Sequence, residues 1–209
     1  MTAYKAAANA AIQAATGVLG RVISKRYQQR QGYHRAARPS QSLARHTVDM
    51  AVFVRRLFGI GKLPDELHAQ VESEGLTYHA DYVAVTRRFS GTIPGVRLPH
   101  SVASYTGSLV FTSERVLATL SMLPRLAGPT VNVRWDAPQT GAARVEISPT
   151  GLQVDADVSR VDEKFTGELS LHYKVAIPDD VLASLARRSL AFDMPPEYVF
   201  RAVGVTYSP

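Results

Sequence analysis

The sequence contains no cysteine, which excludes disulfide bonds, thiolate metal ligands and cysteine nucleophiles. It also lacks any uncharged apolar run of about 18 residues, so we expect no transmembrane helix. Acidic side chains are almost missing from residues 1–62, which hold eleven lysines and arginines against a single acid, Asp49, for a net charge of +10. Residues 63–209 carry −4, so the overall +6 averages two oppositely charged parts. We predict a basic helical region at 1–62 and a second domain at 63–209.

Motifs for catalysis and cofactor binding are missing as well. Neither G-x-S-x-G nor G-x-G-x-x-G occurs. Residues 59–62 resemble the end of a phosphate-binding loop, but Arg56 stands where its first glycine is needed and Leu63 where its Ser/Thr is needed. The six histidines show no metal-ligand spacing. We therefore predict no catalytic residue, no metal site, no cofactor and no enzymatic activity.

Two pairs of polar residues keep a weaker enzymatic or small-ligand alternative open. His79 and Asp81 lie two positions apart in an expected strand, as do Asp155 and Asp157, so each pair shares one face. The first pair is compatible with metal ligation and the second with acid–base work. Gln153 lies two positions before Asp155 and thus on the same face, however, and three polar residues in this pattern are more typical of a solvated sheet face.

The pattern of apolar residues divides the chain into a helical and a strand-rich part. Apolar side chains recur at helical spacing over about 1–31 and 41–58, and Pro64 and Gly75 bound a short third helix. From residue 76 apolar and polar residues alternate, and short turns predict antiparallel neighbours. A last helix is expected from Pro178 to about Arg188, before a tail pinned to the body. The expected strands are 76–89, 101–112, 115–122, 129–136, 142–148, 151–158 and 165–175.

Seven antiparallel strands followed by one helix resemble the pleckstrin-homology-like superfold and its GRAM-like relatives over about residues 72–190. The residues that carry the resemblance are Glu74-Gly75, Thr92-Ile93-Pro94-Gly95 and the run from Gly107 to Arg115. The best-known members hold a tryptophan in the final helix, whereas the only tryptophan here, Trp135, lies in an expected strand, which favours a divergent bacterial form. The expected fold is α+β: N-terminal helices, then a seven-strand antiparallel barrel capped by a C-terminal helix. A lipocalin-like barrel and a small β-sandwich are the alternatives.

The resemblance implies a ligand site in the loop between the first two strands, where members bind phosphorylated lipid headgroups or dock peptides. Here that loop spans 87–100 and offers Arg87, Arg88, Arg97 and His100 as ligand-binding residues. Phe89, Ile93, Val96 and Leu98 look exposed and suited to a bilayer interface. An ordinary mobile hairpin is the alternative interpretation.

The basic N-terminal region is the second candidate contact surface. Arg21, Lys25, Arg26 and Arg30 lie in its first expected helix and are candidates for contact with a membrane or another anion. Packing of the apolar stripe on the acidic domain or on a second copy is an equally simple interpretation. Nucleic acid is the least favoured partner.

The sequence thus predicts a non-enzymatic binding module, cytoplasmic and peripheral to an anionic membrane surface through the basic region and the first barrel loop. One alternative is an adaptor or oligomeric assembly subunit without a membrane role, with a protein or a second copy as its partner. The other is a small-ligand barrel or an enzyme.

Overall fold

The computed structural model describes residues 60–121 and 127–207. The chain divides into two compact units, Met1–His46 and Thr47–Pro209, and the described residues belong to the second. The two helices predicted within 1–58 lie outside the described residues, as do Arg21, Lys25, Arg26 and Arg30.

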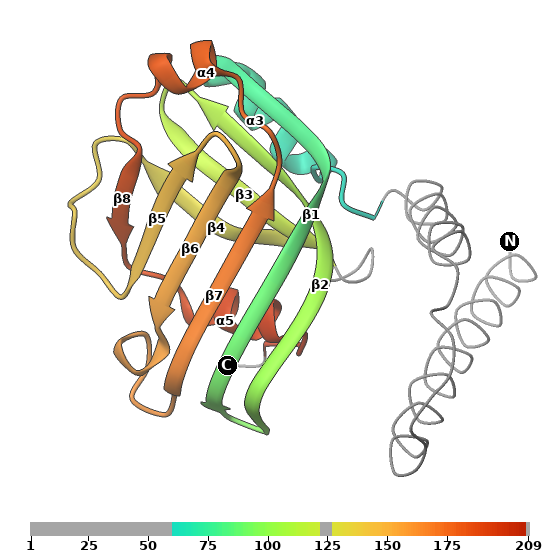
Figure 1. The fold of residues 1–209 in the computed structure, drawn as a ribbon, viewed down its shortest axis with the longest axis vertical. Helices are drawn as coiled ribbons and strands as arrows, with labels where there is room; N and C mark the ends of the chain where they lie inside the picture. Colours follow the sequence, from blue (N-terminus) through green and yellow to red (C-terminus); the bar gives the residue numbers. More distant parts are fainter. Residues whose placement is uncertain (1–59, 122–126, 208–209) are drawn as a thin grey trace, which may run out of the picture. The chain divides into compact units, whose positions relative to one another are not determined.

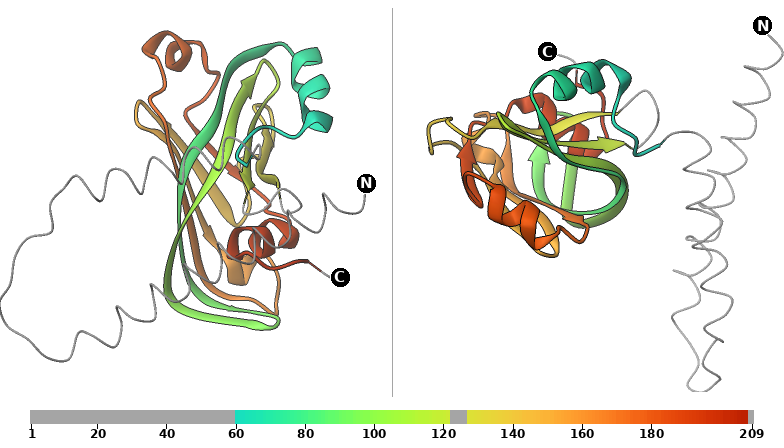
Figure 2. Two further views of the ribbon diagram at one scale, coloured as in Figure 1. Left: turned by 90° about the vertical axis from the view of Figure 1, so that its right-hand side faces the viewer. Right: turned by 90° about the horizontal axis from the view of Figure 1, so that it is seen from above.

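The described part is built on one eight-stranded antiparallel sheet with strand order β4-β3-β2-β1-β7-β6-β5-β8 (Figure 1). Its strands are β1 (Leu76–Ile93), β2 (Val96–Thr112), β3 (Arg115–Ser121), β4 (Gly128–Arg134), β5 (Ala143–Ser148), β6 (Gly151–Asp157), β7 (Thr166–Lys174) and β8 (Ser189–Phe192). The sheet curls until it is nearly a barrel (Figure 2). The seven predicted strands are all present, and β8 is an eighth that the sequence pattern did not predict.

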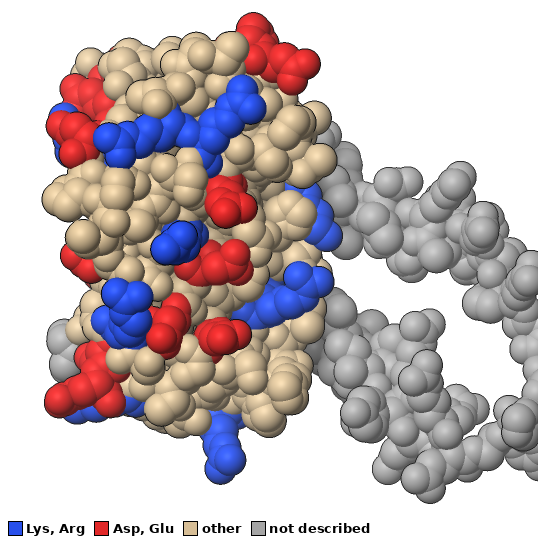
Figure 3. All heavy atoms as spheres, turned by 60° about the vertical axis from the view of Figure 1, so that its left-hand side comes forward, with Lys and Arg blue, Asp and Glu red and all other residues tan. Residues whose placement is uncertain are grey.

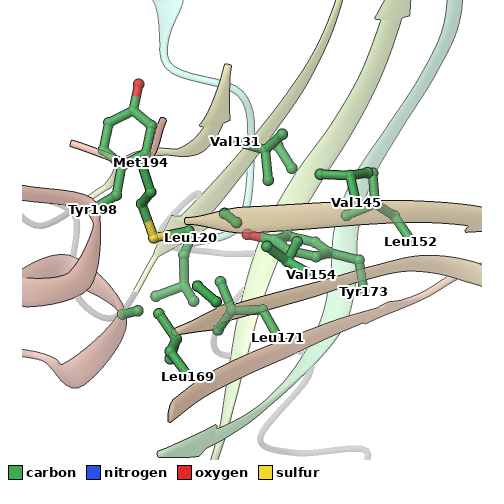
Figure 4. Close-up of a cluster of buried hydrophobic side chains, with 14 of the residues drawn as sticks. Leu120, Val131, Val145, Leu152, Val154, Leu169, Leu171, Tyr173, Met194 and Tyr198 are labelled. Carbon is green, nitrogen blue, oxygen red and sulfur yellow. The ribbon is translucent and has the colours of Figure 1, made fainter. Parts of the chain in front are cut away.

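The strands form because one face of each is apolar. In β7 the buried residues are Leu169, Leu171 and Tyr173, and the residues between them face outward. Figure 4 shows these three side chains in one cluster with Met194 and Tyr198. The hydroxyl group of Tyr173 forms a hydrogen bond with that of Thr130 in β4, so the one polar atom of this buried ring has a partner.

The helix that fills the inner side of the sheet is α5 (Pro196–Val203). It contacts β4 and β1, and Val199 and Ala202 are fully buried. Gly204 ends the helix at φ 90°, a left-handed conformation that glycine adopts without strain. Figure 1 shows α5 behind the lower halves of β6 and β7.

The helix predicted to close the barrel, from Pro178 to about Arg188, is shorter than expected. Only Asp179–Ser184 is helical, as α4, and Leu185 is already extended. The following residues, predicted to be a tail pinned to the body, form β8 and α5. The closing role therefore belongs to α5 and not to the helix that begins after Pro178.

A second, smaller core lies between helix α3 (Asp65–Ser73) and the sheet. Leu63, Val71, Val110 and Leu117 are buried together there. Glu74, which follows α3, forms two short contacts with the Arg115 guanidinium: Nη2 to Oε1 and Nε to Oε2, both 2.8 Å. Among the described helices, none combines the length and the apolar character that crossing a membrane requires.

Candidate functional site: a charged groove on the outer face of the sheet

The segment predicted to be a ligand-binding loop, residues 87–100, is a hairpin. β1 continues to Ile93 and β2 begins at Val96, so only Pro94 and Gly95 form the turn. Phe89 and Ile93, expected to be exposed, are each 1% exposed in the core, and Val96 and Leu98 pack against that core. The expected set of exposed apolar side chains is therefore wrong, because these residues continue the inner face of the barrel.

The four predicted ligand-binding residues are distributed over three places. Arg88 and His100 both line an open groove of about 900 Å³ on the outer face of the sheet. Arg87 points to the opposite, inner face and is 3% exposed. Arg97 lies beside the turn, opposite Thr92. The structure thus brings together two of the four.

His100 reaches the groove through an irregular piece of β2. The pairing between β1 and β2 shifts register between Phe89 and Gly91, and His100 adopts φ 53°, a left-handed conformation rare for a residue with a side chain. Such a conformation persists only where the surrounding structure holds it. The bulge keeps His100 exposed beside Arg88 at the groove's edge.

The centre of the groove is a row of side chains that runs across four strands. Register pairs Arg88 of β1 with Ser170 of β7, Ser170 with Asp155 of β6, and Asp155 with Arg144 of β5. Strands lie about 4.8 Å apart, so the backbones of Arg88 and Arg144 are about 14 Å apart. An aspartate thus lies between two arginines on one exposed surface.

Hydrogen bonds fix the position of two acidic side chains in the groove. The amide of Gln153 donates to Asp155 Oδ1 at 3.0 Å and to Ser170 Oγ at 2.7 Å, which joins neighbouring strands. Asp157 Oδ1 accepts from the backbone nitrogen and the hydroxyl group of Ser159, at 3.1 and 2.6 Å, and caps the short helix η2 (Val158–Arg160). Both carboxylates therefore keep a defined position while they remain exposed.

Several charged side chains in the groove have no partner of opposite sign. Within residues 60–121 and 127–207, Arg88, Arg144, Arg160 and Glu168 form no ion pair closer than 4.0 Å. Glu168 lies on β7 opposite Asp157, so two carboxylates adjoin each other. Figure 3 shows a band of positive side chains across the upper part of the side that carries β5, β6 and β8, and below it positive and negative side chains are interspersed.

His172, one row above the groove on β7, is influenced by the same arginine. Partial burial of the ring lowers the pKa of His172, and the positive charges of Lys174 and Arg88 lower it further. His172 is opposite Gln153, whose amide binds Asp155. The imidazole is therefore neutral near pH 7 and adds no charge to the groove.

The His79–Asp81 pair has a structural explanation. His79 Nε2 lies 3.0 Å from Asp81 Oδ1, and the same oxygen accepts from the backbone nitrogen of Leu63 at 2.9 Å. Asp81 thus holds the segment that leads into α3 against β1. In the described part of the chain, no group of three or more His, Asp or Glu side chains is arranged to hold a metal ion.

Sequence reasoning missed Arg144, Arg160 and Glu168. Each is polar or charged within or directly after an alternating strand, which is the signal of an outer face. They come close to Arg88 because β7, which is far from β1 in the sequence, pairs with β1 in the sheet. That pairing is a property of the topology, which local patterns do not report.

The fold and the groove define a curled antiparallel sheet with an exposed outer surface of mixed charge. Comparison with protein-family models, with curated proteins and with solved structures gives no match for this chain.

Proposed function

We propose that this protein is a non-enzymatic binding module and that its outer groove binds a peptide segment with side chains of both charges. The observation that carries the proposal is the row Arg88–Ser170–Asp155–Arg144, in which an aspartate between two arginines is exposed on a rigid sheet. A ligand that presents negative, positive and negative groups in turn complements Arg88, Asp155 and Arg144. A uniformly negative ligand is attracted by the two arginines and repelled by the aspartate, and a uniformly positive ligand meets the reverse.

The dimensions of the groove fit this class of ligand. Its volume of about 900 Å³ lies at the upper end of the range typical of small-molecule pockets. It is open and has polar side chains, including Gln139 and Thr140, at the rim near β8. An extended peptide lying across the strands can place every second side chain against Arg144, Asp155 and Arg88, because successive side chains of an extended chain point to opposite sides.

The chemistry of the groove supports binding in preference to catalysis. The closest carboxylates, Asp157 and Glu168, are both exposed, and Asp157 is engaged as a helix cap. General acid–base work requires a group whose pKa is tuned by burial or a close charge and which faces a nucleophile. The groove's carboxylates lie in open solvent, where charge recognition is the simpler role.

Amide-resolved NMR of the full chain with three peptides of equal length tests this proposal. Serine occupies every second position of each peptide, and the positions between carry Lys and Glu in alternation, only Lys, or only Glu, at constant ionic strength. We expect the alternating peptide to perturb the amides of Arg88, Ser170, Asp155 and Arg144 in a saturable way, and the other two to perturb them less. Equal response to all three peptides, or no response in β5, β6 and β7, would contradict the proposal.

The charge of residues 1–62 supports a second candidate, contact with an anionic lipid surface. A basic segment gains about 1 kcal/mol per lysine or arginine near such a surface. The candidates are Arg21, Lys25, Arg26 and Arg30. Co-sedimentation with phosphatidylserine-containing vesicles, compared with phosphatidylcholine vesicles, tests it.

We expect the full chain to sediment only with the anionic vesicles, and glutamine substitution of these four residues to abolish this. Arg144→Glu in the groove is the control and is expected to sediment normally. No sedimentation with either vesicle would remove the membrane role, and light scattering would then test the adaptor or oligomer alternative.

A further inference from the structure

The inner face of the barrel contains a buried guanidinium group without a counterion. Arg87 belongs to the inward-facing set of β1, between Val85 and Phe89, and it is 3% exposed. Register places Leu171 of β7 and Ala103 of β2 beside it. A full positive charge therefore lies among mainly apolar neighbours.

The hydrogen bonds of Arg87 leave most of its donors unused. Nη2 donates to Ser101 Oγ at 3.2 Å, and Cζ lies 5.9 Å from the centre of the Tyr105 ring. Nε and Nη1 are shielded from solvent and have no hydrogen-bond acceptor. A guanidinium has five N–H donors, so one polar contact and one aromatic ring satisfy only a small part of it.

No carboxylate compensates this charge. Of the ion pairs within 4.0 Å formed by described residues, none includes Arg87. The other buried arginine, Arg115, differs in this respect: it binds Glu74 with two nitrogens and Asn132 Oδ1 with the third, at 2.8 Å. Buried charges in proteins are ordinarily paired in this manner, which marks Arg87 as an exception.

Access to Arg87 is available from the free part of β2. β3 pairs with β2 only from Thr106 to Phe111, so among the described strands residues 96–105 of β2 pair with β1 alone. Ser101, Ala103 and Tyr105 on the inner side of this part are half-buried. Outward rotation of the Tyr105 side chain would uncover the guanidinium, because its ring lies beside Cζ.

We propose that Arg87 anchors a second binding site, on the inner face of the barrel, for the carboxylate group of a monocarboxylic ligand. Two carboxylate oxygens match a fork of an arginine, in which Nη2 acts together with either Nε or Nη1. Nε and Nη1 are unused, and Nη2 keeps one N–H besides the one that it donates to Ser101. Ser101 Oγ already orients the guanidinium through Nη2. The two sites use different arginines, because Arg87 and Arg88 lie on opposite faces, although Phe89 and Ser101 also border the outer groove.

A monoanion fits this site better than a phosphate. Only one arginine is present, and Leu171, Ala103 and Phe89 provide an apolar surrounding. A dianion would carry one uncompensated charge into this surrounding, whereas one carboxylate neutralises one guanidinium. The apolar neighbours also favour a ligand whose carboxylate is attached to a hydrocarbon group.

NMR of the arginine Nε–Hε groups tests the site in the unmodified full chain. Acetate, octanoate, phosphate and chloride are each titrated at constant ionic strength and pH 7. We expect the Arg87 signal to shift saturably with acetate and octanoate, less with phosphate, and not with chloride. Tighter binding of octanoate than of acetate would identify an amphiphile as the ligand class, and equal affinity a small free carboxylate.

Two variants give matched controls. Arg87→Lys keeps the charge but loses the fork and is expected to weaken acetate binding about tenfold. Arg88→Lys makes the same change one residue away on the outer face and is expected to bind acetate as the unmodified chain does. Arg87 is buried and Arg88 is exposed, so thermal unfolding of both variants checks that a loss of acetate binding does not come from a loss of folded protein.

The proposal is overturned if no carboxylate shifts the Arg87 signal. It is also overturned if Arg87→Lys and Arg88→Lys lose affinity to the same degree, which would indicate diffuse charge attraction. Neither outcome affects the outer groove, whose test uses peptides and resonances of β5, β6 and β7.

Discussion

Arg87 and Arg88 are consecutive residues of β1 whose side chains occupy opposite faces of the same sheet. Arg87 is 3% exposed and meets Ser101 and Tyr105, whereas Arg88 is exposed and lines the outer groove. The alternation of side chains along a strand is the cause. Two neighbouring arginines therefore have different environments and different expected effects on stability and binding.

Arg87→Met is expected to stabilise the fold. Methionine keeps the length of the apolar stem and removes an unpaired buried charge, a change that typically contributes about 1–4 kcal/mol. Urea unfolding of the unmodified chain and the variant measures the difference, with Arg88→Met as the control that should leave stability unchanged. A clear loss of stability in Arg87→Met would show that the guanidinium is already compensated.

Glu74→Gln is expected to destabilise the protein by about 3 kcal/mol, because it leaves the buried Arg115 guanidinium without its carboxylate. Thermal and urea unfolding give the difference. Glu114→Gln, in the exposed pair with Arg134, is the matched control and should produce no measurable change. Equal effects of the two substitutions would contradict the assignment of Glu74–Arg115 as a structural pair.

We predict that the protein loses stability at alkaline pH because Tyr173 is buried. Burial raises the pKa of the Tyr173 hydroxyl well above its usual value, against which the hydrogen bond to Thr130 and the charge of Arg201 act weakly. In the unfolded chain a tyrosine ionises near pH 10, so above this pH the folded state binds more protons and stability falls as pH rises. Urea unfolding at increasing pH should show this slope.

Tyr173→Phe should remove its part of that slope and cost about 1 kcal/mol at neutral pH, because the Thr130 hydroxyl loses one of its two partners and keeps only the backbone oxygen of Ala118. If the slope of stability against pH is the same in the variant, Tyr173 does not carry the effect.

We predict that His172 makes the protein less stable as the pH falls. Its pKa is lowered by burial, then by Lys174 and Arg88, so the unfolded chain takes up a proton at a higher pH than the folded protein does. Stability is expected to fall as pH decreases from the ordinary histidine value of 6.5 through the lower pKa of the folded state. His172→Gln should flatten this slope between pH 7 and the folded-state pKa, as followed by urea unfolding. An unchanged slope would assign it to other groups.

Much of the fold was predictable because the strands alternate clearly. The Val131–Arg134 part of β4 and the Leu169–Tyr173 part of β7 place apolar residues on one face, whereas Trp135, expected in the same strand, lies in the turn after β4. A loop was predicted at 87–100, where the structure has the β1–β2 hairpin, because arginine, serine, glycine and proline in this segment are typical of a loop. Pairing with β7 extends β1 through this segment, which is a tertiary effect.

The sequence pattern did not predict β8 and α5, for two different reasons. β8 has four residues, too few for an alternating pattern to be distinguished. α5 begins at Pro196, directly after Pro195, and proline is favoured in a first helical turn. Its buried Tyr198, Val199, Ala202 and Val203 have helical spacing, so this signal was present in the sequence.

The candidate site was predictable only in part. Arg88 and His100 were identified from one hairpin. Arg144, Asp155 and Glu168 join them through the pairing of β7 with β1 and of β6 with β7. The partners of a strand in a curled sheet depend on long-range closure, which the residues of one strand do not encode.

The most direct test of the proposed groove is the dissociation constant of the alternating Lys/Glu peptide for two charge-reversed variants. Arg144→Glu reverses a charge in the centre of the groove, and Arg97→Glu makes the same change beside the β1–β2 turn, outside it. We expect calorimetry to show weakening of about tenfold for Arg144→Glu and no change for Arg97→Glu. Equal weakening by both variants, or none by either, would contradict the account.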